Sequence, residues 1–201
     1  FSAILGGTAQ SLSLLGLDDD QLIITVDGIE FEAEASSPAS PTAIASIGDG
    51  RTFDELDGAR SVSTVVIGGK TYALVAAIYD NGLQIVDISN PAVPTAVASI
   101  NDGGTDGNNK IFDELDKPSS LTTVDIDGSI YALVAAYGDD GLQIIDISNP
   151  AAPTAVASIT DGGTDDNGDT FDELDGAQMV TTVVVGGSTY ALVIGGYDNG
   201  L

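Results

Sequence analysis

An acidic loop near the C-terminal end of the chain carries the residues best suited to bind a ligand. Residues 161–169 read DGGTDDNGD, and Asp165, Asn167 and Asp169 have the alternate spacing of a calcium-binding loop. Oxygen ligands on a flexible, glycine-rich backbone are what Ca²⁺ prefers. The glutamate expected at the twelfth place is missing. Two interpretations therefore stay open, a calcium site and a solvated acidic surface adapted to salt.

The same kind of loop recurs earlier in the chain, each time followed by the motif FDELD. The earlier loop keeps Asp106 and Asn108 but has Lys110 in the third position, which weakens it as a cation site. Calcium is the one cofactor that the sequence suggests. The candidate ligands are Asp54, Glu55, Asp102, Asp106, Asp113, Glu114, Asp161, Asp165, Asn167, Asp169, Asp172, Glu173 and Asp175.

Catalytic chemistry has little support in the sequence. The chain has no His and no Cys, which excludes Ser-His-Asp and Cys-His nucleophiles and zinc sites built from these residues. Carboxylate pairs recur in every unit, whereas an active site is usually single. Asp87 and Asp146 lie inside the predicted third strand of a unit, and a short carboxylate there typically accepts backbone N–H groups of the following turn. We therefore expect no enzyme.

Charge and composition restrict the partners. The 201 residues include 31 acidic and 5 basic ones, a formal net charge of −26. Nucleic acid and anionic membranes need a basic face and are poor partners. The sequence has no stretch of 18 apolar residues, the length that would predict a membrane-spanning helix. The apolar fraction of 43% is enough for a folded core.

An internal repeat organises the chain. Tyr72, Tyr131 and Tyr190 follow one another at an interval of 59 residues, and Phe53, Phe112 and Phe171 keep the same interval. Self-similarity at such a period is typical of propellers, solenoids and arrays.

Each unit predicts four short strands. In the second copy they cover residues 121–126, 131–136, 142–147 and 154–159, with a turn at Asp127-Gly128. Four antiparallel strands per unit predict an all-β, β-propeller-like fold made of blades. Thr52 and Thr170, three residues before a glutamate, form a capping box and predict one helical turn at FDELD.

The N-terminal region predicts part of a further blade. Residues 1–20 form an extension with one possible docking strand, and residues 22–35 predict a hairpin around Asp27-Gly28. Its second run, IEFEAEA, alternates strictly and aligns with the third strand of a unit, and a fourth strand is predicted over 41–47. We predict an N-terminal extension, a partial repeat, two repeats and half of a third, at residues 1–20, 21–60, 61–119, 120–178 and 179–201.

Two segments resemble a known repeat. LQIVDISNP at 83–91 and LQIIDISNP at 142–150, each preceded by YALVAA and an Asp-Gly or Asn-Gly turn, are similar to the LVIVD repeat. This resemblance covers residues 29–201 and implies β-propeller blades in a bacterial or archaeal protein that is exported or on the surface. It implies no conserved chemistry, and the chain departs from the pattern in its long FDELD-bearing loop.

The order of the strands suggests self-association. The chain holds about three blades' worth of strands in circularly permuted order, whereas closed propellers typically have four to eight blades. The sequence is therefore a piece of a longer array, or copies complete one another's blades. We expect an extracellular or cell-surface structural protein that self-assembles through its blades into a homo-oligomer or filament. The alternative is a propeller module that binds a sugar, a peptide or a cation.

Overall fold

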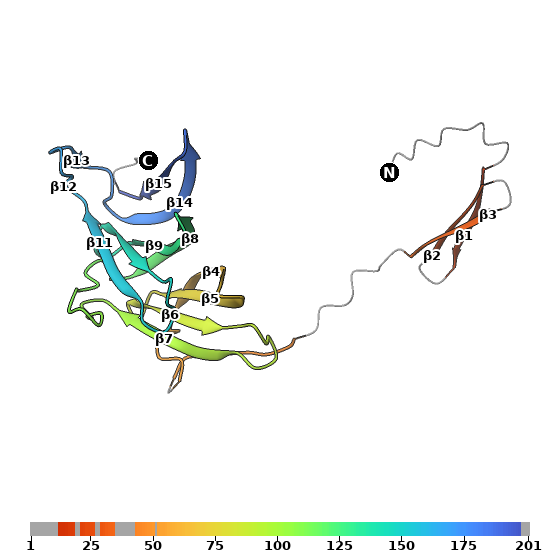
Figure 1. Ribbon diagram of the computed structural model, residues 1–201, viewed down its shortest axis with the longest axis horizontal. Coiled ribbons are helices and arrows are strands. Elements are labelled where there is room, and N and C mark those ends of the chain that lie inside the picture. Colours follow the sequence, from red (N-terminus) through yellow and green to blue (C-terminus); the bar gives the residue numbers. More distant parts are fainter. Residues whose placement is uncertain (1–11, 19–20, 27–28, 35–42, 51, 198–201) are drawn as a thin grey trace. The chain divides into compact units, whose positions relative to one another are not determined.

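The regular structure of the described residues is entirely β. The computed structural model describes residues 12–18, 21–26, 29–34, 43–50 and 52–197, and it divides into two compact units between Ala43 and Ile44. Strands account for all regular elements in these ranges, which contain no helix (Figure 1). The predicted all-β class is confirmed.

The first unit is a three-stranded antiparallel sheet. Strands β1 (Leu12–Asp18), β2 (Gln21–Val26) and β3 (Ile29–Glu34) lie in the order β1-β2-β3. The pairing of β2 with β3 confirms the predicted hairpin, although its turn residues lie outside the described ranges, as do Ala35 and most of the extension. The strand predicted over 41–47 is not formed in its described part, because residues 43–48 have no regular structure and are exposed.

The second unit contains two four-stranded antiparallel blades. Blade 1 consists of β4 (Ala59–Ile67), β5 (Lys70–Ala77), β6 (Gly82–Asp87) and β7 (Thr95–Asn101), paired in chain order. Blade 2 repeats this arrangement 59 residues later with β8 (Pro118–Ile126), β9 (Ser129–Ala136), β10 (Gly141–Asp146) and β11 (Thr154–Thr160). All four strands predicted for this copy are present.

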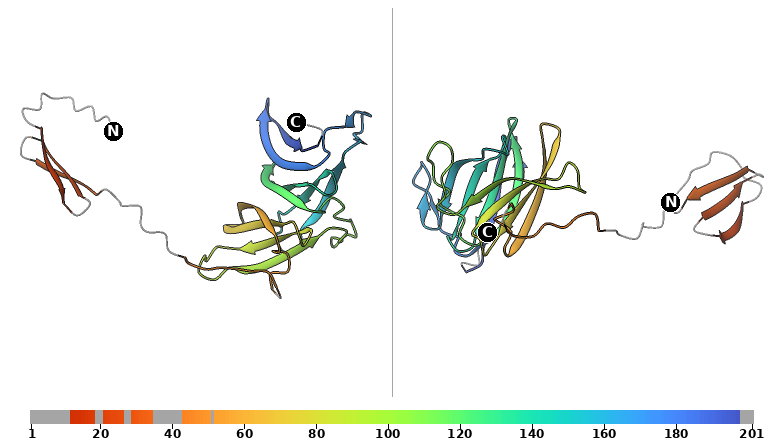
Figure 2. Two further views of the ribbon diagram at one scale, coloured as in Figure 1. Left: turned by 180° about the vertical axis from the view of Figure 1, so that it is seen from behind. Right: turned by 90° about the horizontal axis from the view of Figure 1, so that it is seen from below.

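A hairpin continues the series after blade 2. Strands β14 (Ala177–Val185) and β15 (Ser188–Gly195) pair as β8 and β9 do, and the short β12 (Gly163–Thr164) and β13 (Thr170–Phe171) pair within the acidic loop. The first strands β4, β8 and β14 contact one another in series. Figures 1 and 2 show the blades side by side as separate sheets, a propeller-like arrangement that is not closed.

Local sequence explains the tight turns. Asp127 and Gly128 have φ values of 53° and 84°, as a two-residue primed turn requires, and Gly68-Gly69 occupies the same place in blade 1.

A β-bulge interrupts the pairing of the third and fourth strands between Ile85 and Val86, and again between Ile144 and Ile145. Such bulges increase the twist of each blade.

The main core lies between the two blades. Leu74, Leu83 and Ile85 of blade 1 pack with Val134 and Ile145 of blade 2, all at most 1% exposed. A second, smaller cluster joins the other face of blade 2 to β14 and β15. Alternating side chains of the middle strands therefore serve two different interfaces, as apolar runs covered on both faces predict.

The helical turn predicted at FDELD is wrong. Residues of the motif form bends and turns, and in the third copy its phenylalanine belongs to β13. Its backbone amides bond to side chains of the blade: the N–H groups of Asp113 and Glu114 both donate to Gln143 Oε1, at 2.9 and 3.1 Å. In the first copy the N–H of Glu55 donates to Gln84 Oε1 at 3.4 Å rather than to Thr52. Tertiary acceptors thus replace the hydrogen bonds that a helical turn would have made.

Candidate functional site

The acidic loops are organised by hydrogen bonds to their own backbone. Asp165 Oδ1 accepts from the N–H groups of Asn167 and Asp169 at 2.8 and 2.9 Å. Asp106 Oδ1 accepts from Asn108 and Lys110 in the same way, and its Oδ2 accepts from Ala155 N–H of blade 2 at 3.2 Å. These backbone bonds lower the pKa of both aspartates.

Other predicted ligands also accept hydrogen bonds from their own loops. Asp102 accepts from the N–H of Leu115 at 3.2 Å, Asp161 from that of Leu174 at 3.0 Å, and Asp172 from the Thr170 hydroxyl at 2.8 Å. Within the described ranges, no group of three or more His, Cys, Asp or Glu side chains is placed to hold a metal ion. The loops thus do not form a coordination shell as they stand, and calcium binding stays a prediction from the sequence.

The FDELD glutamates have a different environment from the loop aspartates. Glu55 and Glu114 are each only 4% exposed, whereas Glu173 in the third copy is exposed. Glu55 Oε1 accepts from the side-chain amide of Asn101, but Oε2 of both buried glutamates has no hydrogen-bond partner. Asp54 and Asp113 beside them do not share this burial.

Two buried glutamines hold the FDELD segments in place. Gln143 donates from Nε2 to Ala157 O at 2.9 Å while its Oε1 accepts the two FDELD amides, and Gln84 donates to Ala98 O at 2.8 Å. Both are at most 1% exposed. We did not predict this role, but a signal was present: the same polar residue interrupts an apolar strand at the same place in both copies.

Electrostatics sets the buried glutamates apart. Burial, together with the negative charges of Asp139, Asp113, Asp102 and Asp140, raises the pKa of Glu114 to about 8. Burial also raises the pKa of Glu55 to about 7, with Asp80, Asp54 and Asp49 contributing. A carboxyl group removed from water and surrounded by like charges favours its neutral form.

The two aspartates of the third strands and two of the lysines have structural partners. Asp87 accepts from Ser89 N–H at 2.9 Å and Asp146 from Ser148 N–H at 2.8 Å, which closes the turn after each third strand as predicted. Lys70 Nζ lies 2.9 Å from Asp87 Oδ2, and Lys117 Nζ lies 3.6 Å from Asp116 Oδ2. These side chains do not bring a nucleophile and a base together.

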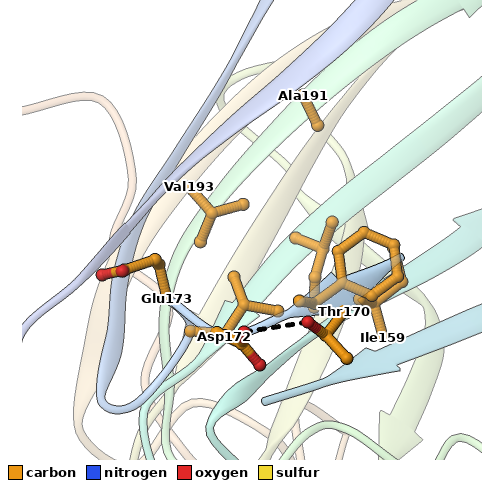
Figure 3. Close-up of a pocket in the computed structure, with 9 residues that line it drawn as sticks. Ile159, Thr170, Asp172, Glu173, Ala191 and Val193 are labelled. Carbon is orange, nitrogen blue, oxygen red and sulfur yellow. Dashed lines mark hydrogen bonds between the residues drawn. The ribbon is translucent and has the colours of Figure 1, made fainter. Parts of the chain in front are cut away.

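An apolar cavity of about 270 Å³ lies between blade 2 and β15. Figure 3 shows Ala191 and Val193 of β15 on one side of it and Ile159 and Thr170 opposite, while the Glu173 carboxylate points away. No strand pairs with the outer edge of β15 in the described ranges. The cavity can therefore accept an apolar segment.

A polar pocket of about 290 Å³ lies where the first strands begin. Arg60, Ser119 and Gln178, at equivalent places 59 residues apart, line it together with Ile78 and Tyr137. Ser119 is buried, and its hydroxyl donates to Ala177 O at 2.8 Å, which links β8 to β14. Hydroxyl groups thus tie neighbouring first strands together around this pocket.

Comparison with known proteins agrees with this architecture. No curated protein matches the sequence. No helix among the described residues is long and apolar enough to cross a membrane. The model of the LVIVD repeat matches residues 59–102, which span blade 1, and residues 124–161, which span most of blade 2. Blades 1 and 2 are therefore similar to the LVIVD repeat, as the resemblance of their third strands predicted.

Proposed function

We propose that the chain is a non-enzymatic structural protein whose LVIVD blades associate side by side with blades of further copies. The observation that carries this proposal is the apolar cavity beside β15. Apolar side chains line this cavity, and burying such apolar surface against another strand is favourable. The protein thereby acts as a β-propeller-like scaffold that builds oligomers or filaments.

The filled interface between blades 1 and 2 indicates what fits this cavity. Six residues that line the cavity lie 59 positions after residues that are buried in that interface. The cavity residues are Leu142, Ile159, Phe171, Leu174, Ala191 and Val193. Their buried counterparts are, in the same order, Leu83, Ile100, Phe112, Leu115, Ala132 and Val134. In the filled interface, Ile145, Ile147 and Ala155 from the third and fourth strands complete the core. An apolar β-strand at the edge of β15 is the matching ligand.

Strand β3 of a second copy is the occupant that we propose. Its sequence, with Ala35 after it, aligns with the third strand of a unit and alternates apolar residues with glutamates. In that register Phe31, Ala33 and Ala35 take the places of Gln143, Ile145 and Ile147, and the glutamates face away. β3 pairs with β2 only, so one of its edges is open to another strand in the described ranges. Strand addition at two such edges satisfies the backbone groups of both.

We place this assembly outside the cell or on its surface. A net charge of −26 keeps such repeats soluble, while the attraction between them comes from the apolar edges. Head-to-tail contacts of this kind close into a ring or extend into a filament, depending on the rotation between copies. The open form is favoured because β1, which pairs in the described ranges with β2 only, leaves a further open edge for a neighbour.

Deleting residues 1–35 tests this proposal. Sedimentation velocity and electron microscopy of the full chain should show oligomers or filaments, and the deleted chain should be monomeric with its circular dichroism spectrum still β. Filling the cavity with Ala191→Trp should abolish assembly in the same way, whereas Val184→Trp on exposed β14 should not. Particles of unchanged size after the deletion or after Ala191→Trp would overturn the proposal.

A ligand-binding module is the second candidate function, and the polar pocket supports it. Arg60 is one of only 5 basic residues and makes no ion pair with another described residue. With a tyrosine, a serine and a glutamine nearby, it suits a ligand that carries a carboxylate, such as an acidic sugar. Calorimetric titration with glucuronate, compared between the native chain and Arg60→Ala, tests this function: loss of heat only in the variant supports it.

A further inference from the structure

The first strands of consecutive units form a row in the second unit of the structure. β4 contacts β8, and β8 contacts β14 (Figure 1). The N–H of Leu121 donates to the Ser61 hydroxyl at 3.2 Å, which joins β8 to β4. In the same way, 59 residues later, the N–H of Val180 donates to the Ser120 hydroxyl at 3.3 Å. Neighbouring first strands therefore meet in one repeated register.

One end of this row is a face of blade 1. Val62 of β4 is 64% exposed, whereas its counterparts Leu121 and Val180 are buried in the blade interfaces, at 6% and 4% exposure. Val75, paired with Val62, is half-buried, whereas its counterpart Val134 is fully buried. Both valines line a hollow of about 160 Å³. Beside its first strand, blade 1 thus exposes the surface that blade 2 buries against blade 1.

The other end of the row is a face of the β14–β15 hairpin. Leu192 alternates along β15 with Ala191 and Val193, so it lies on the face opposite the apolar cavity. It is 40% exposed, whereas Leu74 and Leu133, at the same place in blades 1 and 2, are 1% and 6% exposed. Other exposed apolar side chains of this face are Val183, Val185, Tyr190 and Ile194. The hairpin thus exposes the surface with which blade 1 packs on blade 2.

Neither surface shares the acidity of the chain. β14 and β15 contain no charged residue, and Arg60 is the one charged residue of β4, although the chain has 31 acidic residues. Extended apolar surface without charge is typical of contacts between proteins. Because blades 1 and 2 already join two such faces, the exposed faces at the two ends of the row are complementary to each other.

We propose that blade 1 of one copy packs face to face on β14 and β15 of a second copy, so that its β4 follows β14 in the row of first strands. Met179 takes the place of Ser61 and Ser120 in this register. It is 55% exposed and lies beside Val62 of the other copy, where its thioether makes the contact apolar. This inference rests on the proposed function in taking a second copy as the partner, but it assigns different surfaces, the faces of the outer blades instead of the edge of β15.

Two variants that each block one surface test the pairing. Val62→Asp blocks the face of blade 1 and Leu192→Asp that of the hairpin; both residues are exposed, so the circular dichroism spectrum should stay β. In sedimentation velocity each variant alone should be monomeric, because its one intact surface meets only blocked ones. An equimolar mixture should form dimers and nothing larger, since only the hairpin of Val62→Asp and blade 1 of Leu192→Asp are intact.

Val66→Asp is the matched control for added charge on β4. Val66 is 64% exposed, as Val62 is, and blade 2 has the exposed Asp125 at this place. A carboxylate is therefore compatible with the internal interface at this position. Val66→Asp should assemble like the native chain.

Cysteine trapping locates the contact. The chain has no Cys, so a disulfide can join only introduced residues. Mixed and oxidised, Val62→Cys and Met179→Cys should form a disulfide-linked dimer of one copy each. Val66→Cys mixed with Met179→Cys should not, because four residues along a strand span about 13 Å and a disulfide joins Cα atoms within about 7 Å.

The outcomes separate this contact from strand addition. Dimers in the mixture of the two aspartate variants, together with the trapped disulfide, support the face contact. It is overturned if Val62→Asp or Leu192→Asp alone assembles like the native chain, or if the Val62→Cys and Met179→Cys mixture forms no disulfide. If deletion of residues 1–35 abolishes assembly and Val62→Asp does not, strand addition stands and the face contact fails. If Val62→Asp abolishes assembly and the deletion does not, the reverse holds.

Discussion

Replacing Gly141 by alanine should destabilise blade 2 through packing alone. Gly141 begins β10, and its φ is not in the left-handed region, so alanine introduces no backbone strain. Its β-carbon would lie 2.5 Å from Ile159 O and still closer to Glu114 Oε2. The carbonyl belongs to the β10–β11 ladder, in which Leu142 pairs with Ile159, so it cannot move without breaking that pairing.

The expected magnitude is the difference between two opposing terms. Overpacking a rigid site costs about 1–3 kcal/mol. Replacing glycine by alanine also reduces the conformational freedom of the unfolded chain, which stabilises the folded state by about 0.4–1 kcal/mol. We therefore expect Gly141→Ala to lower the free energy of unfolding by about 1–2 kcal/mol. Gly138→Ala should cost less, because its closest contact is the side-chain oxygen of Asp116, which can turn away.

Urea denaturation followed by circular dichroism at pH 5 measures these differences. Gly107→Ala is the control, because nothing lies within 4 Å of its β-carbon position and its φ is not positive. It should leave stability unchanged or raise it by up to about 1 kcal/mol. If Gly141→Ala is as stable as Gly107→Ala, the close approach of Ile159 O and Glu114 to Gly141 is refuted.

Three further predictions concern the core and the acidic surface. Phe112→Ala should lower the free energy of unfolding by about 3–5 kcal/mol, because Phe112 is buried between the blades. Ile111→Ala, at the exposed neighbouring residue, should lower it by less than about 1 kcal/mol. Equal losses in the two variants would contradict this core. If the acidic loops bind calcium, a hundredfold excess over Kd should add about 2.7 kcal/mol per site, and EDTA should lower the Tm; an unchanged Tm at fixed ionic strength rejects the site. NaCl alone should raise the Tm, because the Debye length falls from about 10 Å at 0.1 M to about 3 Å at 1 M; a Tm that stays constant or falls would argue against charge repulsion.

Local patterns in the sequence predicted the strands of the blades correctly. The 59-residue interval, the alternation within each strand and the Asp127-Gly128 turn are read from neighbouring residues, and the structure has strands and turns at these places. The turn aspartates Asp87 and Asp146 also followed from local chemistry. Such features depend on contacts within a few residues, which the order of residue types encodes directly.

The FDELD motif shows where local reasoning failed. Thr52 has the spacing of a capping box, but the N–H of Glu55 bonds to Gln84 Oε1, 29 residues further along the chain, and the amides of the second copy bond to Gln143 in the same way. Propensity for a helical turn is weak, and a buried acceptor fixed in a strand overrides it. The predicted strand over 41–47 failed likewise, because its described part has no partner strand.

The glutamates of the motif separate what the sequence alone determined from what tertiary structure decided. FDELD is identical in all three copies, so the sequence marks Glu55, Glu114 and Glu173 as equivalent carboxylates and candidate ligands. In the structure Glu55 and Glu114 are buried against Gly82 and Gly141, whereas Glu173 is exposed beside a hairpin whose outer edge has no described partner. Whether water or the third strand of a blade surrounds a carboxyl group decides its protonation, and that neighbour comes from a distant part of the chain.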